Sequence, residues 1–246
     1  MSFLEIERLT KRHGDRAALD AVSLSVGEGA FVALVGPSGS GKTTLLKSIN
    51  RLAEPDEGSV RIGGRDVRDV PLAELRHGIG YVIQSIGLFP HMSVAENIGI
   101  VPRLMGDHGT GRTAELLELV ALPAEMASRY PRELSGGQAQ RVGFARALAA
   151  GPKLMLMDEP FGALDPVTRD SLGRAYRDLH DRLGLTTLMV THDIAEALLL
   201  ADRIVVLIDG QIRADASPGD LLKADDPDVK AMIAVPRRQA ERLAAL

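Results

Sequence analysis

The sequence has 246 residues, of which 45% are hydrophobic and 25% are charged, and its formal net charge is −4. This composition is ordinary for a globular protein of one large or two modest domains, and the acidic balance argues against a protein that coats nucleic acid. The sequence contains no cysteine, which excludes disulfides, thiol catalysis and thiolate metal sites. The acidic start predicts no signal peptide, and no apolar run is long enough to predict a membrane span.

The first elements are strands that lead into a glycine-rich loop. Alternating patterns predict strands over residues 3–9 and 18–26, and a continuous apolar run predicts a buried strand over 31–35. A helix is predicted over 44–52. Its apolar face would carry Leu45, Leu46, Ile49 and Leu52.

The loop between this strand and this helix has the composition of a phosphate-binding P-loop. It consists of Gly36, Pro37, Ser38, Gly39, Ser40, Gly41, Lys42, Thr43 and Thr44. The glycines allow backbone N–H groups to surround a polyphosphate, and the start of the helix adds further N–H donors. In this context Lys42 would reach the β- and γ-phosphates, and the Thr43 hydroxyl would bind Mg²⁺. Kinases, GTPases and motor ATPases all share such a loop.

The middle of the chain is predicted to be mostly helical. Short strands near 60–62 and 80–84 flank a short helix over 71–76. Capping boxes are predicted where Ser93 is followed by Glu96 and where Ser135 is followed by Gln138. The first begins the helical stretch, the second begins a helix with Val142, Ala145 and Leu148 on one face, and another helix is predicted over 113–120.

Alternating strands and helices return after about residue 152. A buried strand is predicted over 154–157, and Asp165-Pro166 predicts the start of a helix that runs to about Leu183. The remaining predictions are a strand over 186–190, a helix over 193–200, a hairpin over 204–212, a short helix capped by Ser217, and a polar tail over 236–241. The expected organisation is an α/β nucleotide-binding core (1–87 and 153–224), a helical subdomain (88–152) and a C-terminal tail (225–246).

Asp158 and Glu159 directly follow the apolar strand over 154–157. In an open parallel sheet, ligands bind at the carboxyl ends of the strands. Asp158 would hold Mg²⁺ there, and Glu159 would act as the general base on the attacking water. An acidic turn is the alternative, but the P-loop upstream favours the catalytic interpretation.

A second glycine-rich stretch contains Leu134, Ser135, Gly136, Gly137 and Gln138. Each of two adjacent helical glycines costs about 1 kcal/mol relative to alanine, so helix stability gives no reason for both. A second anion site, at which bare N–H groups approach a phosphate, does give one. The stretch from Leu134 to Arg141 resembles the signature of ATP-binding-cassette (ABC) ATPases.

Residues 3 to 224 resemble that family, and the motifs follow its order. The resemblance implies an α/β fold with a P-loop NTPase (RecA-like) core, an antiparallel β-subdomain and an inserted α-helical subdomain. It also implies ATP and Mg²⁺ as cofactors. Gly36–Thr43 corresponds to Walker A, Leu154–Asp158 to Walker B and Ala163–Asp165 to the D-loop. Gln84 matches the Q-loop residue that reaches Mg²⁺, and His192 matches the switch histidine.

The resemblance implies a mechanism in which two chains close over two ATP molecules. The partner would be a second copy or a close paralogue, whose Ser135 to Gly137 contact the ATP held by the first chain. The family often places an aromatic residue against adenine, and here the matching position holds His13. Imidazole stacks less broadly than a phenol ring, and an ordinary loop histidine is the alternative.

The stretch from Tyr81 to Val94 resembles importer ATPases for glycine betaine, choline and carnitine, and residues 49–52 and 100–104 strengthen that resemblance. Leu88, Phe89 and Met92 are large apolar residues in a loop, and a loop seldom exposes them without a partner. In the family this region receives a membrane permease, which implies a place at the cytoplasmic face of the membrane. Packing beneath the helical subdomain is the alternative.

Other functions stay open at this point. An importer ATPase for another solute, such as an amino acid, would look similar, because this subunit does not touch the solute. A quaternary ammonium solute would instead be held in an aromatic cage of a separate extracytoplasmic binding protein. A non-transport ABC ATPase would usually carry a long coiled coil or two fused cassettes, and a P-loop kinase leaves 134–141 unexplained. Many relatives carry C-terminal CBS modules, and sensing through such modules is not expected in this sequence.

Overall fold

The structure, a computed structural model, describes residues 2–85, 87–107 and 112–244. The chain forms two compact units, the first made of Met1–Val67 and Leu188–Leu246 and the second of Arg68–Thr187. Ile86, part of the stretch that predicts docking, lies outside the described residues, as do residues 108–111 of the predicted helical subdomain and 245–246 of the predicted tail. The boundaries of that subdomain and tail stay a prediction.

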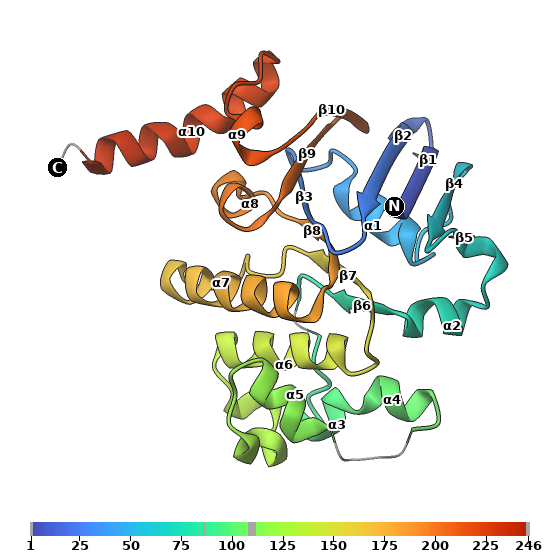
Figure 1. The fold of residues 1–246 in the computed structure, drawn as a ribbon, viewed down its shortest axis with the longest axis vertical. Helices are drawn as coiled ribbons and strands as arrows, with labels where there is room; N and C mark the ends of the chain where they lie inside the picture. Colours follow the sequence, from blue (N-terminus) through green and yellow to red (C-terminus); the bar gives the residue numbers. More distant parts are fainter. Residues whose placement is uncertain (1, 86, 108–111, 245–246) are drawn as a thin grey trace. The chain divides into compact units, whose positions relative to one another are not determined.

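The first unit contains a four-stranded antiparallel sheet with the order β2-β1-β4-β5 (Figure 1). Its strands are β1 (Ser2–His13), β2 (Arg16–Gly27), β4 (Glu57–Ile62) and β5 (Arg65–Asp66). β1 and β2 are longer than predicted, because their hairpin closes tightly, with His13 opposite Arg16. Gly14 occupies this turn at φ 60°, a conformation that glycine adopts without strain.

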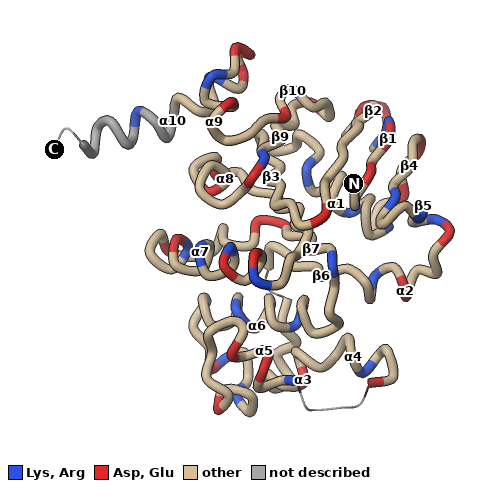
Figure 2. The backbone as a smooth tube through the Cα atoms, viewed as in Figure 1, with Lys and Arg blue, Asp and Glu red and all other residues tan. Residues whose placement is uncertain are grey.

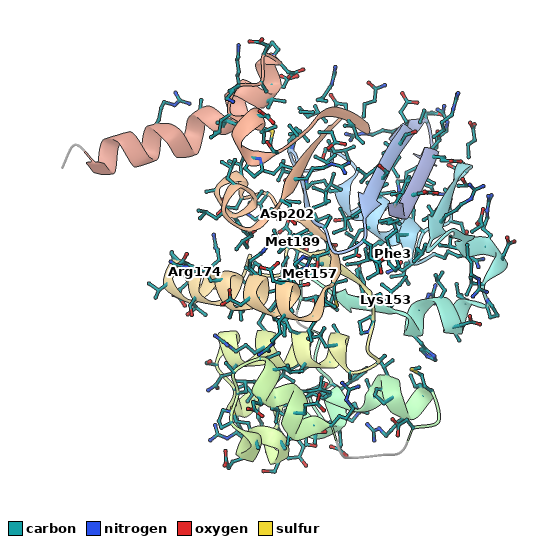
Figure 3. All side chains as sticks on the ribbon, in the orientation of Figure 1. Phe3, Lys153, Met157, Arg174, Met189 and Asp202 are labelled. Atoms are coloured by element: carbon teal, nitrogen blue, oxygen red, sulfur yellow. The ribbon has the colours of Figure 1, made fainter. Side chains whose placement is uncertain are left out.

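The P-loop strand and its neighbours form the second part of this unit. β3 (Phe31–Val35) is buried at every residue and pairs in parallel with β9 (Arg203–Ile208), which pairs antiparallel with β10 (Gln211–Ala216). Asp202, labelled in Figure 3, accepts a hydrogen bond of 2.8 Å from the backbone N–H of Phe31. This bond fixes the start of the strand that leads to the P-loop.

Helix α1 (Lys42–Ile49) follows the P-loop, and Leu45, Leu46 and Ile49 are buried on its inner face. Leu52 is 51% exposed, so its predicted place on that face is wrong. The helix ends three residues earlier, since Arg51 takes a left-handed φ of 54° and the backbone N–H of Leu52 turns back to the Lys47 carbonyl.

The C-terminal part of the first unit contains α8 (Ile194–Leu200), α9 (Pro218–Leu221) and α10 (Pro227–Ala244). Residues 236–241, predicted as a polar tail, continue helix α10. Asp226 accepts hydrogen bonds from the backbone N–H groups of Asp228 (2.9 Å) and Val229 (3.1 Å). Val229 and Ile233 are buried, and α10 contacts α8, so burial of an apolar face stabilises the helix.

The second unit contains two parallel strands and most of the helices. Strands β6 (Ile79–Val82) and β7 (Leu154–Asp158) pair in parallel. Its helices are α2 (Leu72–His77), α3 (Val94–Ile98), α4 (Ile100–Leu104), α5 (Thr113–Leu119), α6 (Gly136–Leu148) and α7 (Pro166–Leu183), with short 3-10 turns over Ala124–Ser128 and Pro131–Glu133. A further 3-10 turn (Val67–Asp69) and strand β8 (Thr186–Val190) cross the boundaries between the units.

Helices α6 and α7 run alongside one another and share an aromatic core (Figure 1). The ring of Phe144 lies 5.1 Å from Tyr176 and 5.8 Å from Phe161, and all three side chains are buried. Helix α7 contains charged residues of both signs (Figure 2), and ion pairs join Arg174 to Asp170 and Arg177 to Asp181. None of the helices described here is long and apolar enough to cross a membrane.

Candidate functional site

The P-loop wraps tightly against its own unit, and two glycines make that approach possible. A Cβ atom on Gly36 would lie 2.0 Å from the Leu207 carbonyl oxygen, and one on Gly41 would lie 2.1 Å from the Ala18 carbonyl oxygen. Gly41 also has a φ of 105°, which favours glycine. The sequence position of both glycines is therefore fixed by backbone contact, independently of any ligand.

Lys42 places its ammonium group inside this loop. The residue is 7% exposed, and Nζ donates to the carbonyl oxygens of Gly36 and Pro37 at 2.8 Å each. The Ser40 hydroxyl lies 3.4 Å away. A cation surrounded by acceptors at the centre of a glycine loop and the start of a helix is suited to bind phosphate oxygens.

His192 lines the same cavity as the P-loop. This cavity, of about 720 Å³, is bordered by Gly36, Pro37 and Ser38 and by the segment from His192 to Ala195. Ile208, Asp228, Ala231 and Met232 complete its walls. The first unit therefore brings together the P-loop and the predicted switch histidine, which sequence spacing alone could not establish.

His13 lies exposed at the end of β1, and its contact with a base stays a prediction. Arg16, its partner across the hairpin, is a residue that the sequence analysis missed. Its guanidinium Nη2 donates to the Gly39 carbonyl at 3.5 Å, which places a second cation beside the P-loop. The sequence signal for this contact was Gly14, because a tight turn there brings Arg16 opposite His13.

The second unit brings together Gln84 and Glu159. Glu159 follows the last residue of β7 at a left-handed φ of 46°, and its Oε2 accepts a hydrogen bond of 2.9 Å from Nε2 of Gln84. Asp158 is 7% exposed. Burial, assisted by the charge of Asp158, raises the pKa of Tyr81 to about 12. A carboxylate oriented by an amide in this way is equipped to accept a proton from water.

The signature stretch begins helix α6. Ser135 is its N-cap, and the predicted capping box with Gln138 is present, as is the one that joins Ser93 to Glu96. A Cβ atom on Gly137 would lie 2.8 Å from Cγ2 of Thr168, whereas one on Gly136 would meet its nearest neighbour at 3.8 Å. Close packing on α7 thus gives a structural reason for Gly137, and the anion site at these glycines stays a prediction.

Three comparisons with known proteins bear on this arrangement. The family model described as "ABC transporter" matches residues 19–162. The chain is 50% identical over 224 residues to the carnitine transport ATP-binding protein OpuCA of Listeria monocytogenes, which covers 89% of this chain and 56% of that protein. It is 49% identical over 224 residues to the glycine betaine/carnitine/choline transport ATP-binding protein OpuCA of Bacillus subtilis, with coverages of 89% and 59%.

This chain belongs to the ABC transporter family. It spans less than two thirds of the length of these two relatives. The dimeric structure of the ATP-binding cassette MJ0796 in a post-hydrolysis state with ADP and Pi superposes with a TM-score of 0.77 at 35% identity, covering 87% of this chain and 98% of that one. The predicted α/β fold class is confirmed, and the structure is an ABC cassette with an antiparallel sheet and a mixed core sheet.

In this ABC cassette, Asp165 caps helix α7 as predicted. Its Oδ1 accepts from the backbone N–H groups of Val167 (3.1 Å) and Thr168 (3.0 Å). Hydrogen bonds from the side chain and backbone of Thr168 hold the pKa of Asp165 below its usual value. The carboxylate is therefore ionised wherever the protein is folded near neutral pH, and its role toward a second chain stays a prediction.

The loop that follows Gln84 is organised by a residue that the sequence analysis missed, Asn97. This side chain is fully buried, accepts from the Phe89 backbone N–H at 2.8 Å, and donates to the carbonyl oxygens of Phe89, Met92 and Ser93 at 3.0 to 3.2 Å. Phe89 itself is 40% exposed, while Leu88 and Met92 are half-buried. No local pattern indicates such a buried asparagine.

The other end of this loop is held by Arg146 of α6, whose Nη1 donates to the Gly87 carbonyl at 2.6 Å. Burial lowers the pKa of this guanidinium. The loop is thus fixed to the helix that begins at the signature.

Proposed function

We propose that this chain is the ATP-hydrolysing subunit of an ABC importer that takes up an osmoprotectant such as glycine betaine, choline or carnitine. The observation that carries the proposal is sequence similarity. The chain is 50% and 49% identical, over 89% of its length, to proteins named for carnitine and for glycine betaine/carnitine/choline transport. The geometry of the P-loop supports the nucleotide-binding part independently.

ATP is bound by the P-loop residues Gly36, Pro37, Ser38, Gly39, Ser40, Gly41, Lys42, Thr43 and Thr44. Lys42 exchanges its bonds to the loop carbonyls for bonds to the β- and γ-phosphates, which are stronger because both partners are charged. His13 lies against the base.

The Thr43 hydroxyl, the Asp158 carboxylate and the Gln84 amide oxygen would hold Mg²⁺, which would supply positive charge beside the phosphates. This ligand set fits the ion, which retains waters and takes few protein ligands beside substrate phosphates. Asp158 supplies the one nearly buried carboxylate of this set.

Hydrolysis is carried by Glu159 as general base, with Gln84 orienting its carboxylate and His192 near the γ-phosphate. The residues from Leu134 to Gln138 of a second copy or close paralogue contact the same ATP from the opposite side, and Asp165 contributes at the contact between chains. Closure over ATP and opening after phosphate loss drive transport. The dimeric state of the similar MJ0796 cassette supports this step.

A membrane permease receives the loop that carries Leu88, Phe89 and Met92, and an extracytoplasmic binding protein delivers the solute to that permease. The subunit therefore works at the cytoplasmic face of the membrane. No nucleic acid takes part. The helical subdomain over 88–152 transmits the permease contact to the core.

The test is reconstitution with the permease and binding protein encoded beside this chain, followed by measurement of ATP hydrolysis. Glycine betaine, choline and carnitine should each be compared with an amino acid and with no solute. Stimulation by a quaternary ammonium compound supports the proposal. Stimulation only by the amino acid would favour an importer for another solute, and hydrolysis without any permease association would favour a non-transport ABC ATPase.

A further inference from the structure

The segment that carries His192 is held on both sides while its side chain stays exposed. Thr191, the preceding residue, is 2% exposed, and its backbone N–H donates to the Leu34 carbonyl of β3 at 3.2 Å. Asp193, the following residue, is the N-cap of α8 and accepts from the backbone N–H groups of Ala195 and Glu196. The imidazole therefore projects from a short connection between a buried strand and a helix.

Two hydrogen bonds cross this connection. The backbone N–H of Asp193 donates to Oγ1 of Thr191 at 3.0 Å, and the Thr191 hydroxyl donates in turn to the carboxylate of Glu196 through a short hydrogen bond. We call Thr191 and Glu196, with these two bonds, the 191–196 latch. It closes a small ring around His192 that consists of one side-chain hydroxyl, one carboxylate and the backbone between them.

This arrangement differs from the capping boxes at Ser93 and Ser135. At Ser93 and Ser135 the third helical residue accepts from the backbone N–H of the N-cap, which is the usual capping box. At Asp193 that N–H goes to Thr191 instead, and the third helical residue, Glu196, takes the Thr191 hydroxyl. Glu196 thus bonds to Thr191, the residue before His192, and a helix can start without such a bond.

We propose that Glu196 is a positioning residue for His192 and acts through the Thr191 hydroxyl. The inference rests on the proposed role of His192 in ATP hydrolysis. The His192 ring lines the cavity beside Gly36, Pro37 and Ser38, so its reach toward a phosphate depends on the backbone at 191 and 193. A charge-assisted bond in a partly buried place holds that backbone more firmly than a bond between neutral groups.

The test compares variants that remove and retain the latch. Thr191→Val keeps the shape of the side chain but removes the hydroxyl, and Glu196→Ala removes the acceptor. Both should lower kcat by about 10-fold or more, because a displacement of about 1 Å at a reacting group costs on the order of 10²-fold. The Kd for ATP should stay within about twofold. Thr191→Ser, which keeps the hydroxyl, should restore most of kcat, and Leu199→Ala, on the exposed face of the same helix, is the matched control.

A double-variant comparison separates positioning from a general loss of stability. In a His192→Ala background, Glu196→Ala should cause no further fall in kcat, since the group that it positions is gone. If Glu196→Ala lowers kcat in the His192→Ala background by the same factor as in the parent, the positioning role is overturned. The same holds if both latch variants keep the parental kcat while His192→Ala alone lowers it. A parental kcat for His192→Ala would instead overturn the proposed role of the histidine.

Discussion

Lys42 is the residue that tests the predicted phosphate site most directly. Its ammonium group is nearly buried and bonded to acceptors of its own loop. Lys42→Ala should raise the Kd for ATP by roughly 10- to 100-fold, because hydrogen bonds to charged groups contribute about 1.5–3 kcal/mol. Titration calorimetry with ADP and with a non-hydrolysable ATP analogue measures this. Lys47→Ala, an exposed lysine of the same helix, is the control, and equal affinity in both variants would contradict the P-loop assignment.

Glu159 is a second residue at which one substitution separates binding from hydrolysis. Glu159→Gln retains an oxygen that can accept the Gln84 bond, so the local geometry should persist. The rate of hydrolysis should fall by about 10²–10⁴-fold, since the proposed general base is lost while the P-loop is unchanged. ATP should then hold the variant as a dimer in gel filtration. Glu118→Gln, exposed on α5, should behave as the parent. A folded Glu159→Gln protein that stays monomeric with ATP would contradict the dimer mechanism.

At the scale of elements, helix starts were predictable because their signals are local. Ser93, Ser135, Asp165, Asp193 and Ser217 all accept hydrogen bonds from the first helical turn. The features that were not predicted are set by particular contacts that no sequence pattern indicates. Helix α1 ends before Leu52 because the chain turns back at Arg51, Asn97 is buried against the loop that precedes α3, and α10 packs on α8. The glycines of the P-loop were identified by their motif, although backbone contacts with Ala18 and Leu207 also require them.

The loop between β6 and α3 depends on Asn97. Asn97→Ala removes the side chain that bonds to Phe89, Met92 and Ser93, so unfolding should become easier by about 2–4 kcal/mol. Urea denaturation of the isolated chain measures this change. Leu104→Ala, which truncates a side chain that is 69% exposed, should change stability little. Parental stability of Asn97→Ala would mean that the loop is held by other contacts.

The paired glycines at the start of α6 allow a matched comparison. Gly136→Ala adds a methyl group at ordinary contact distance and should stabilise the helix by up to about 1 kcal/mol. Gly137→Ala forces a shift at Thr168, and such overpacking costs about 1–3 kcal/mol. Thermal melting should therefore rank the first variant above the second. Thr168→Ser should narrow the gap because it removes Cγ2, and an unchanged gap would show that Thr168 is not the obstacle.

At the scale of the whole molecule, Phe89 tests assembly with a permease. Phe89→Asp should leave the melting temperature and the affinity for ATP unchanged, because the ring is 40% exposed and lies edge-on to His91. Co-purification with the permease should fail, since an unpaired charge in an apolar socket costs several kcal/mol. Leu199→Asp, at an exposed leucine of α8, is the control. A lowered melting temperature would instead indicate that Phe89 packs within its own unit, and normal assembly and uptake would exclude this loop as the docking site.

The packing of α6 on α7 has a consequence for how the proposed dimer would close and open. Gly137 lies against Thr168 at one end, and Phe144 lies against Tyr176 further along, so the two helices pack together at two places. The signature begins α6, and Asp165 caps the start of α7. We therefore expect both surfaces to reach the second chain of the proposed dimer, and to leave it, in the same movement. A state in which the signature contacts the second chain and Asp165 does not would first require the aromatic core between α6 and α7 to separate.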